Sequence, residues 1–398
     1  MQEKTLKSRL FTYYLTLILN SIALSIPHAI LTVLLLSKGI KLYQIAAIQL
    51  FYNIAMTIFE FPSGVISDII SRRWTFLFAN ITLIIAYFII LIYDSYILMS
   101  IAWFLYGLST ALSTGTIESD MINYVKINKM DYYTKLFKNS NLIALVGMII
   151  GASLGQFLYN RIDEKIYIVS ILLLSLIILI IIFNYPVKEK IKDKRRESQS
   201  LKTKIVSIIK EGKRQIQSNI YLKYSIITLS LLQIFFQLHF HYWQALSLEY
   251  HISKKLFFII YILFQFISIG IYNLPVDKFN EKRIFPIGII TIGSILWIRG
   301  TDDYKFLIGY MIIVAIVSFM KYYMTYILNK KVEIETISTI TSFDSTMQRL
   351  CSILTLSILN ILLRKYSLIS IFYINSILVV LIFSVIIFRI KTLENEKG

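Results

Sequence analysis

Ionisable side chains occur within long apolar runs of this sequence, where a charge is costly to bury. They are Glu60, Glu118, Asp120, Asp344, His28, His239, His241, Lys321 and Arg349. Carboxylates and imidazoles can take up and release protons, whereas lysine and arginine can bind anionic groups or pair with carboxylates. If the runs cross a membrane, these side chains must face protein or water, so each is a candidate functional group.

Three carboxylates are the candidates for carrying a coupling proton: Glu60 is the first choice, Glu118 the second, and Asp344 is the third candidate. The first two share a helical face with amide or hydroxyl side chains one or two turns earlier. These neighbours are Asn53 and Thr57 for Glu60, and Thr110 and Thr114 for Glu118. A purely structural hydrogen bond or charge pair is the alternative for each carboxylate. Asp120 is close to the end of its run, and we expect it to be solvated.

Two cations and one carboxylate lie in consecutive runs near the end of the chain. Lys321 and Asp344 are at similar distances from the ends of their runs, so we expect a buried ion pair between them. Arg349 lies deeper and shares a helical face with Ser342 and Thr346. It could bind an anionic group or pair with a carboxylate from another run.

The run at 222 to 248 carries a stripe of polar side chains at spacings of three or four residues. Its members are Ser230, Gln233, Gln237, His241 and Gln244. This spacing places them on one helical face, and a polar face at membrane depth should line a cavity. His239 lies off the stripe, and we expect it to have a packing role.

The composition of the chain identifies the apolar runs as membrane spans. Apolar residues make up 57% of the 398 residues and charged residues only 16%, far from the averages of soluble domains. A membrane core about 30 Å thick takes roughly 20 apolar helical residues to cross, and lipid pairs no backbone groups, so each run predicts a helix. Twelve spans are predicted, at 10 to 36, 43 to 66, 74 to 93, 97 to 123, 139 to 160, 166 to 186, 222 to 248, 255 to 275, 283 to 299, 304 to 329, 338 to 363 and 367 to 390.

The spans divide into two groups of six, which predicts an all-α membrane protein of two pseudo-symmetric six-helix bundles. The bundles comprise residues 1–186 and 222–398, and a basic segment at 187–221 joins them. Within that segment, apolar residues at 201 to 216 repeat at helical spacing opposite lysines, which predicts an amphipathic helix. The helix could lie along the membrane surface or be solvated between the bundles.

The formal net charge is +18, and the basic residues are concentrated in one alternate set of loops that includes both terminal segments and 187–221. Lys and Arg are retained on the cytoplasmic side, so both termini are predicted cytoplasmic, in the cell membrane of a bacterium. A nucleic-acid binder would instead gather its basic residues on one folded surface, so we expect no nucleic acid partner. The single Cys351 allows no disulfide within the chain and no cysteine-based metal site, and no metal is expected.

Between the second and third runs, residues 64 to 73 read GVISDIISRR. This loop resembles G-x-x-x-D-R-x-G-R-R/K, which lies at the same place in the major facilitator superfamily. The matching residues are Gly64, Asp68, Arg72 and Arg73, while Ile69 and Ser71 depart from the pattern. A fainter copy follows the eighth run, where the matching residues are Asp277, Lys278 and Lys282.

The resemblance implies the major facilitator fold and a role for both loops as a conformational latch on the cytoplasmic side. A carboxylate is stabilised at the positive end of a helix, and the resemblance points Asp68 toward the start of the eleventh span, around Ser338. Breaking that contact would let the two bundles open inward. Simple anchoring of these charges at the membrane surface is the alternative.

The resemblance also implies that the first, fourth, seventh and tenth spans surround the substrate path. The candidates to line it are Asn20, Ser25, His28, Gln233, Gln237, His241, Gln244, Lys321 and Arg349. In the fifth span, Gly147, Gly151 and Gly155 form a row that permits close helix packing. The row resembles a glycine-rich motif of the family's drug/proton antiporters, although Ala152 replaces its proline. Helix packing alone would also explain it.

The function implied by the resemblance is secondary active transport and not enzymatic catalysis. We expect proton-coupled export of a small drug, metabolite or peptide-like compound by alternating access, because the matched motifs and the aromatic-rich spans look most like bacterial exporters. Import of a small anionic solute is the first alternative, with Lys321 and Arg349 holding the anion. A multispan membrane enzyme is a further alternative, but such enzymes need sizeable loops for their catalytic residues, and the loops opposite the basic set are short. A non-transporting scaffold with this fold is the last alternative.

The expected partners are a small-molecule substrate, protons or another coupling ion, and membrane lipid. The sequence has no G-x-x-x-x-G-K-[ST] phosphate-binding loop, so nucleotide hydrolysis by that route is excluded. We expect a monomer without a cofactor.

Overall fold

The computed structural model forms two compact units, Met1–Ser198 and Gln199–Gly398. The described residues are 2–28, 30–69, 71–114, 116–128, 132–185, 219–275, 293–295, 304–332 and 337–395, with isolated positions at 206, 210, 214 and 217. Every element in these ranges is a helix. The predicted linker helix at 201 to 216 and the predicted ninth span at 283 to 299 lie outside them, apart from a few positions, and stay predictions.

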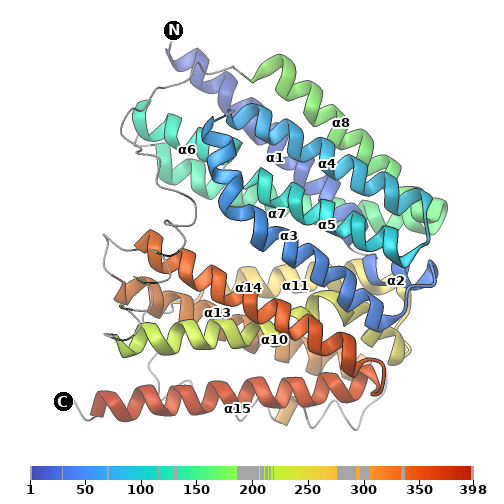
Figure 1. Cartoon of the computed structure of the whole chain (residues 1–398), viewed down its shortest axis with the longest axis vertical. Coiled ribbons are helices and arrows are strands. Elements are labelled where there is room, and N and C mark those ends of the chain that lie inside the picture. The colour runs from blue at the N-terminus through green and yellow to red at the C-terminus, as the bar shows by residue number, and fades with distance from the viewer. Residues whose placement is uncertain are drawn as a thin grey trace. The chain divides into compact units, whose positions relative to one another are not determined.

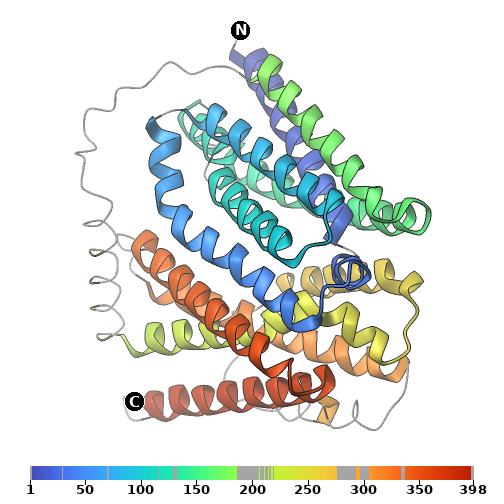
Figure 2. The ribbon, with the colours of Figure 1, turned by 45° about the vertical axis from the view of Figure 1, so that its right-hand side comes forward.

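The first unit is a bundle of helices connected by short segments (Figure 1). Its elements are α1 (Gln2–His28), α2 (Leu31–Ser37), α3 (Leu42–Ile69), α4 (Arg72–Ile92), α5 (Tyr96–Ser113), α6 (Ile117–Asn128), α7 (Tyr133–Ile162), η2 (Asp163–Lys165) and α8 (Ile166–Asn184). Helix α1 packs against α7 and α8, while α5 packs against α3 and α4. Figure 2 shows α4 and α5 lying side by side within this unit.

The first predicted span is interrupted. Helix α1 ends at His28 and α2 begins at Leu31, so the continuous helix expected over 10 to 36 is wrong. Pro27 lies in the last turn of α1. A proline cannot donate a backbone hydrogen bond and crowds the preceding turn, which bends or ends a helix. The apolar run conceals this break because the residues on both sides of it are hydrophobic.

The fourth predicted span is also divided, with α5 ending at Ser113 and α6 beginning at Ile117. The sequence between them contains two threonines and Gly115, which are weak helix formers. Thr114 has extended backbone angles, with φ −62° and ψ 137°. The single helix expected over 97 to 123 is therefore wrong, and α6 is a separate element.

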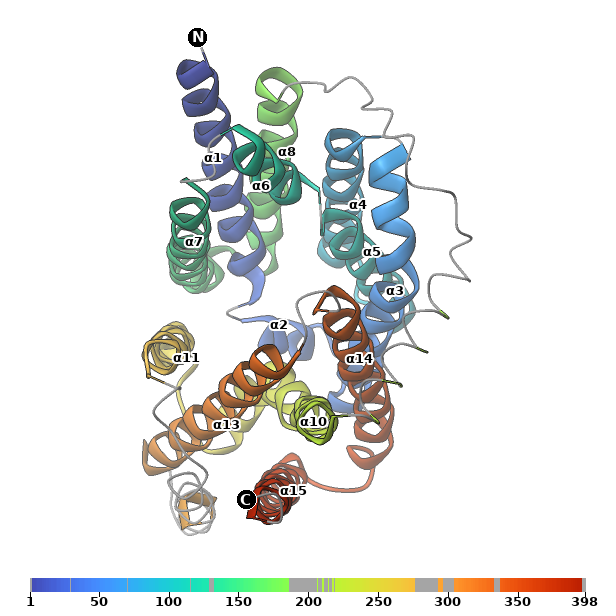
Figure 3. The same ribbon diagram turned by 90° about the vertical axis from the view of Figure 1, so that its left-hand side faces the viewer.

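The glycine row of α7 lies directly against α1, and Figure 3 shows the two helices side by side. A Cβ added at Gly147 would lie 2.7 Å from Cβ of Ser21, and one added at Gly151 would lie 2.6 Å from the carbonyl oxygen of Ile22. At Gly155 it would collide with the Ile26 carbonyl. The prediction that the row permits close helix packing is confirmed.

The second unit is built around α10. Its elements are α10 (Ile220–Glu249), η3 (Lys254–Leu256), α11 (Phe257–Tyr272), α13 (Tyr304–Lys331), α14 (Ile337–Leu362) and α15 (Leu368–Asn395). Helix α10 packs against α13, α14 and α15, and α11 packs against α13. Asn219 starts α10 by accepting hydrogen bonds from the backbone N–H groups of Tyr221 and Leu222.

Aromatic side chains fill the interior of the second unit. His239 is 4% exposed, its Nδ1 lies 2.6 Å from the Tyr310 hydroxyl, and its ring centroid lies 4.7 Å from that of Phe264. These contacts join α10 to α11 and α13. The expected packing role of His239 is confirmed.

Nine stretches of the described residues are long and apolar enough to cross a membrane, and one of them, Lys138–Asn184, contains both α7 and α8. A shorter apolar stretch, Leu368–Ile382, lies in α15. Apart from the two interruptions, the described helices lie where spans are predicted. The prediction of an all-α, multi-pass membrane protein is confirmed.

Candidate functional site

The paired arginines at the start of α4 bind two other helices of the first unit. Ser71 caps α4 by accepting a hydrogen bond from the Trp74 N–H at 3.2 Å, so Arg72 and Arg73 occupy its first turn. Arg72 Nη1 lies 3.7 Å from Asp120 Oδ1 on α6. Arg73 Nη2 donates a 2.6 Å hydrogen bond to the Ile182 carbonyl, in the last turn of α8, where carbonyls lack helical partners.

Asp120 is buried rather than solvated, at 6% exposure, so the expectation for this residue is wrong. The Tyr185 hydroxyl donates a 2.6 Å hydrogen bond to Asp120 Oδ2. With its oxygen facing Arg72, the Asn123 amide accepts hydrogen bonds from Nη1 at 3.0 Å and Nη2 at 3.3 Å. Because α6 is a separate helix, Asp120 lies in its first turn and not at the end of α5.

The latch itself stays a prediction. Gly64 and Asp68 lie in the last turns of α3, where side chains are outside the description, and Asp277, Lys278 and Lys282 lie outside the described residues. The expected contact of Asp68 near Ser338 would join the two units. The described geometry shows how Arg72 and Arg73 tie α4 to α6 and α8.

The two candidate carboxylates of the first unit have different surroundings. Glu60 is half-buried on α3, and the side chains of Asn53 and Thr57 bond to carbonyls of the same helix. Glu118 is exposed in the first turn of α6, where the helix dipole favours a carboxylate. The expectation that Glu118 shares a helical face with Thr110 and Thr114 is wrong, because α5 ends at Ser113 and Glu118 lies in the next helix.

In the second unit, the polar stripe of α10 contacts a second polar stripe on α14. Gln233 Nε2 donates to Gln348 Oε1 at 2.7 Å, and Gln237 Nε2 donates to Ser352 Oγ at 3.0 Å. Gln348 and Ser352 were not among the predicted site residues. Asp344, Gln348 and Ser352 follow one another at intervals of four residues, which would have identified them as one helical face.

Asp344 lies at the end of this hydrogen-bond series. Its Oδ2 accepts a 2.8 Å hydrogen bond from Gln348 Nε2, whereas its Oδ1 is buried without a hydrogen-bond partner in the described part of the chain. A buried acceptor that lacks a partner costs about 1–3 kcal/mol. Asp344 is therefore linked through Gln348 to Gln233, from one helix to the next.

Lys321 of α13 lies near this series but makes a different contact from the one expected. Its Nζ is 4.9 Å from the ring centroid of Phe236, a cation–π distance. Among the described contacts, no direct ion pair joins Lys321 to Asp344, although their charges attract each other at longer range. The expectation of a directly paired lysine and aspartate is therefore wrong.

The remaining predicted residues of the second unit lie on the same two helices. His241 Nε2 lies 3.0 Å from Gln237 Oε1, and since that oxygen only accepts, Nε2 carries the hydrogen. Gln244 is buried at 1% exposure. Arg349 is half-buried on α14, next to Gln348 in the sequence.

In the first unit, the predicted cavity residues of α1 separate into two kinds. Ser25 is buried, and its Cβ would lie 2.8 Å from a Cβ added at Gly151, so it packs against α7, and its place in a cavity stays a prediction. Asn20 is half-buried. His28 is exposed, and its Nε2 lies 2.8 Å from the Tyr106 hydroxyl of α5. Tyr106 was not predicted, because apolar runs conceal tyrosines.

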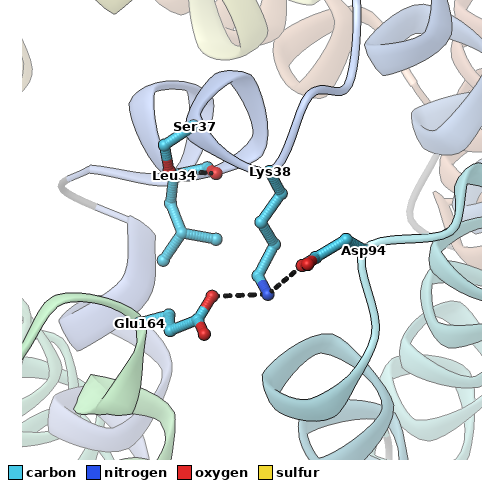
Figure 4. Close-up of polar contacts among 5 residues, drawn as sticks. All are labelled: Leu34, Ser37, Lys38, Asp94 and Glu164. Atoms are coloured by element: carbon cyan, nitrogen blue, oxygen red, sulfur yellow. Dashed lines mark hydrogen bonds and ion pairs between the residues drawn. The ribbon is translucent and has the colours of Figure 1, made fainter.

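At the opposite end of the first unit from Arg72, Lys38 joins three interhelical segments (Figure 4). Its Nζ lies 2.7 Å from Asp94 Oδ1 and 2.5 Å from Glu164 Oε2. The lysine side chain is 4% exposed, whereas those of Asp94 and Glu164 are 69% and 43% exposed. Burial lowers the pKa of the Lys38 ammonium, but hydrogen bonds to the two carboxylates outweigh burial and raise that pKa above 10.5.

Comparisons with known proteins agree with this architecture. Residues 13–273 match the model of the Major Facilitator Superfamily. A crystal structure of a mutant of the nucleoside transporter NupG is similar with a TM-score of 0.74 and 14% identity, over 96% of this chain and 99% of NupG. A second NupG structure is similar with a TM-score of 0.69 and 14% identity, over 98% of both chains. No curated protein sequence matches the chain. Likeness at this identity shows a shared fold.

Proposed function

Since this chain belongs to the Major Facilitator Superfamily, and is therefore a membrane transporter and not an enzyme, we propose that it couples proton movement to transport of a small molecule. The two units would alternate in exposing a binding site between the two sides of the membrane. Spans one, four, seven and ten would surround the substrate, as the family resemblance implies. The proton would bind within the second unit.

The observation that carries this proposal is the hydrogen-bond series from Asp344 to Gln233. Protonation of Asp344 at Oδ1 would neutralise a carboxylate that is partly desolvated. Release of the proton would restore the negative charge and its attraction to Lys321. Either change alters what Gln348 bonds to. Gln348 in turn holds Gln233 of α10, so the protonation state can change the contact between α10 and α14.

Export is the direction that we propose, because the latch loop and the glycine row resemble those of bacterial exporters. Import of a small anionic solute is the second candidate, and the placement of Lys321 favours it. This cation lies over an aromatic face within the second unit and could attract an anion. The fold is shared with NupG, a nucleoside transporter, so nucleosides belong among the compounds to be tested.

The proposal is tested by transport into proteoliposomes with and without a pH gradient across the membrane. The compounds are an organic cation, an organic anion, a dipeptide and a nucleoside, each offered with the outside acidic and with the outside alkaline. We expect one class to accumulate against its gradient in only one of the two conditions. Flux of every accepted compound that is independent of the pH gradient would contradict proton coupling.

Variants of the three candidate carboxylates identify the coupling group. We expect Asp344→Asn to abolish accumulation driven by the pH gradient. Glu60→Gln and Glu118→Gln are measured in parallel. Asp163→Asn is the matched control, because it makes the same chemical change in the η2 segment, away from the hydrogen-bond series of the second unit. Normal accumulation by Asp344→Asn with loss in Glu60→Gln would move the coupling site to the first unit.

A further inference from the structure

A histidine and three tyrosines of the first unit gather where α1 is interrupted. His28 is the last residue of α1 and its Nε2 lies 2.8 Å from the Tyr106 hydroxyl. The ring of Tyr106 packs edge to face against Tyr52 of α3 at 5.4 Å and against Tyr87 of α4 at 5.9 Å, centroid to centroid. Four elements therefore contribute to one aromatic cluster.

The packing of α3 against α5 fixes the positions of two of these rings. A Cβ added at Gly107 would collide with the carbonyl oxygen of Tyr52 and would lie 2.9 Å from Cβ of Ala55. The two helices are therefore as close as their backbones allow, and Tyr106 is the neighbour of that glycine in the sequence. A site whose rings are held in place before a ligand arrives loses little conformational entropy on binding.

One polar atom of the cluster is left without a well-formed hydrogen bond. Tyr87 is 1% exposed, and its hydroxyl makes no hydrogen bond of standard geometry in the part of the chain that the structure describes. Buried hydroxyl groups are almost always hydrogen-bonded. The neighbour of this hydroxyl is the Tyr106 side chain, so Tyr87 can help to position Tyr106.

The helix interruption adds a second reason to expect a ligand here. Irregular backbone at membrane depth is tolerated where it is buried in protein or lines a water-filled cavity. Some transporter folds build their substrate sites from interrupted helices. His28 is at this interruption and is exposed, and an imidazole in contact with lipid would be costly.

The second unit contains a histidine–tyrosine pair of the same chemistry that has no such access. His239 and Tyr310 are hydrogen-bonded at 2.6 Å, but they are 4% and 0% exposed. In the first unit His28 is exposed, and Tyr106 and Tyr52 are half-buried. The two pairs therefore differ in whether a solute can reach them.

We propose that His28, Tyr106 and Tyr52, with Tyr87 packed behind the Tyr106 ring, bind a planar heteroaromatic solute, and this rests on the proposed transport function. Aromatic rings held edge to face present a surface on which a planar ring can pack. The imidazole and the phenol hydroxyls both donate and accept hydrogen bonds, which suits ring nitrogens and exocyclic polar groups. None of the four is a carboxylate, lysine or arginine, so the site favours an uncharged ring.

The test is equilibrium binding to the purified full-length chain in detergent, without a pH gradient. Adenine and indole are the planar probes, and ribose is a non-planar probe with many hydroxyl groups. We expect adenine and indole to bind and ribose not to bind. Equal binding of all three, or binding of neither planar probe, would overturn the proposal.

Variants locate the binding. Tyr106→Leu removes the ring and should weaken adenine binding roughly tenfold, since stacking on an aromatic ring is worth about 1–3 kcal/mol. Tyr106→Phe keeps the ring and should weaken it only about fivefold, through the lost hydroxyl. Tyr310→Phe, in the buried pair, should leave it unchanged. Adenine affinity that Tyr106→Leu does not alter would place the probe elsewhere and contradict the proposal.

Two further measurements keep the result interpretable. If Tyr106→Leu does not fold, Tyr52→Leu and His28→Gln take its place, with the same expected loss of adenine affinity. Asp163→Asn, at a residue outside both proposed sites, should bind adenine as the unaltered chain does. If adenine binds normally but no compound shows gradient-driven flux, the proposed proton-coupled transport is contradicted and the binding site is not. If gradient-driven flux is present but these variants leave adenine binding unchanged, the proposed binding site is contradicted and the transport function is not.

Discussion

Asp120 shows how one carboxylate of α6 is stabilised by a neighbour on α4 and another at the end of α8. Arg72 approaches Oδ1 from α4, and the Tyr185 hydroxyl donates to Oδ2 just after the end of α8. The side chain is buried, so each partner replaces water that would otherwise solvate the charge. Arg72 and Arg73, in the first turn of α4, therefore stabilise the first unit internally, in addition to the latch role predicted for them.

Tyr185→Phe should lower stability, because it removes a hydrogen bond to a charged group. Such bonds contribute about 1.5–3 kcal/mol, so the thermal unfolding midpoint in detergent should fall by several degrees. Tyr159→Phe is the control, since the Tyr159 hydroxyl makes no hydrogen bond among the described residues. Equal midpoints for the two variants would show that the Tyr185–Asp120 contact is not formed.

Lys38 makes a pH-dependent contribution at the other end of the same unit. Its pKa is raised in the folded chain, so its contribution is complete below the ordinary pKa of 10.5 and is lost as pH rises above that value. Lys38→Met should lower stability by about 1 kcal/mol at pH 8, because the two carboxylates stay solvated. The difference from the unaltered chain should shrink at pH 11. A difference that grows with pH would contradict the assigned contacts.

At the scale of elements, the contact between α1 and α7 depends on the absence of side chains on one face of α7. Gly155→Ala places a Cβ against the Ile26 backbone, which cannot move as a side chain can. We expect a loss of about 1–3 kcal/mol, measured by denaturant unfolding. Gly270→Ala on α11 is the control, because no atom of the described structure lies within 4 Å of its new Cβ. A smaller loss at Gly155 than at Gly270 would be inconsistent with this packing.

Most of these elements could be predicted from the sequence because length and hydrophobicity decide where a membrane helix lies. The interruptions near Pro27 and Gly115 could not, since apolar residues continue across both. The consequences reach the site: Glu118 is separated from Thr114, and Asp120 turns toward α4 and α8. The α10 stripe was predicted from its spacing, but its partners Gln348 and Ser352 depend on which helix packs against α10.

At the scale of the whole molecule, the basic residues predict cytoplasmic termini. This is tested in a Cys351→Ala background, where single cysteines are placed at Lys254, before α11, or at Lys330, at the end of α13. A membrane-impermeant maleimide applied to intact cells should label the first position and leave the second unlabelled until the cells are opened. The reverse pattern would contradict the predicted orientation.

In the proposed mechanism a proton on Asp344 drives transport, and exchange measurements separate that step from substrate binding. In proteoliposomes, the accepted compound is followed in two ways: by accumulation driven by a pH gradient, and by exchange between equal concentrations on both sides without a gradient. For Asp344→Asn we predict loss of accumulation, at least about tenfold, with exchange retained. Accumulation by Asp344→Asn at the rate of the Asp163→Asn control would contradict the account.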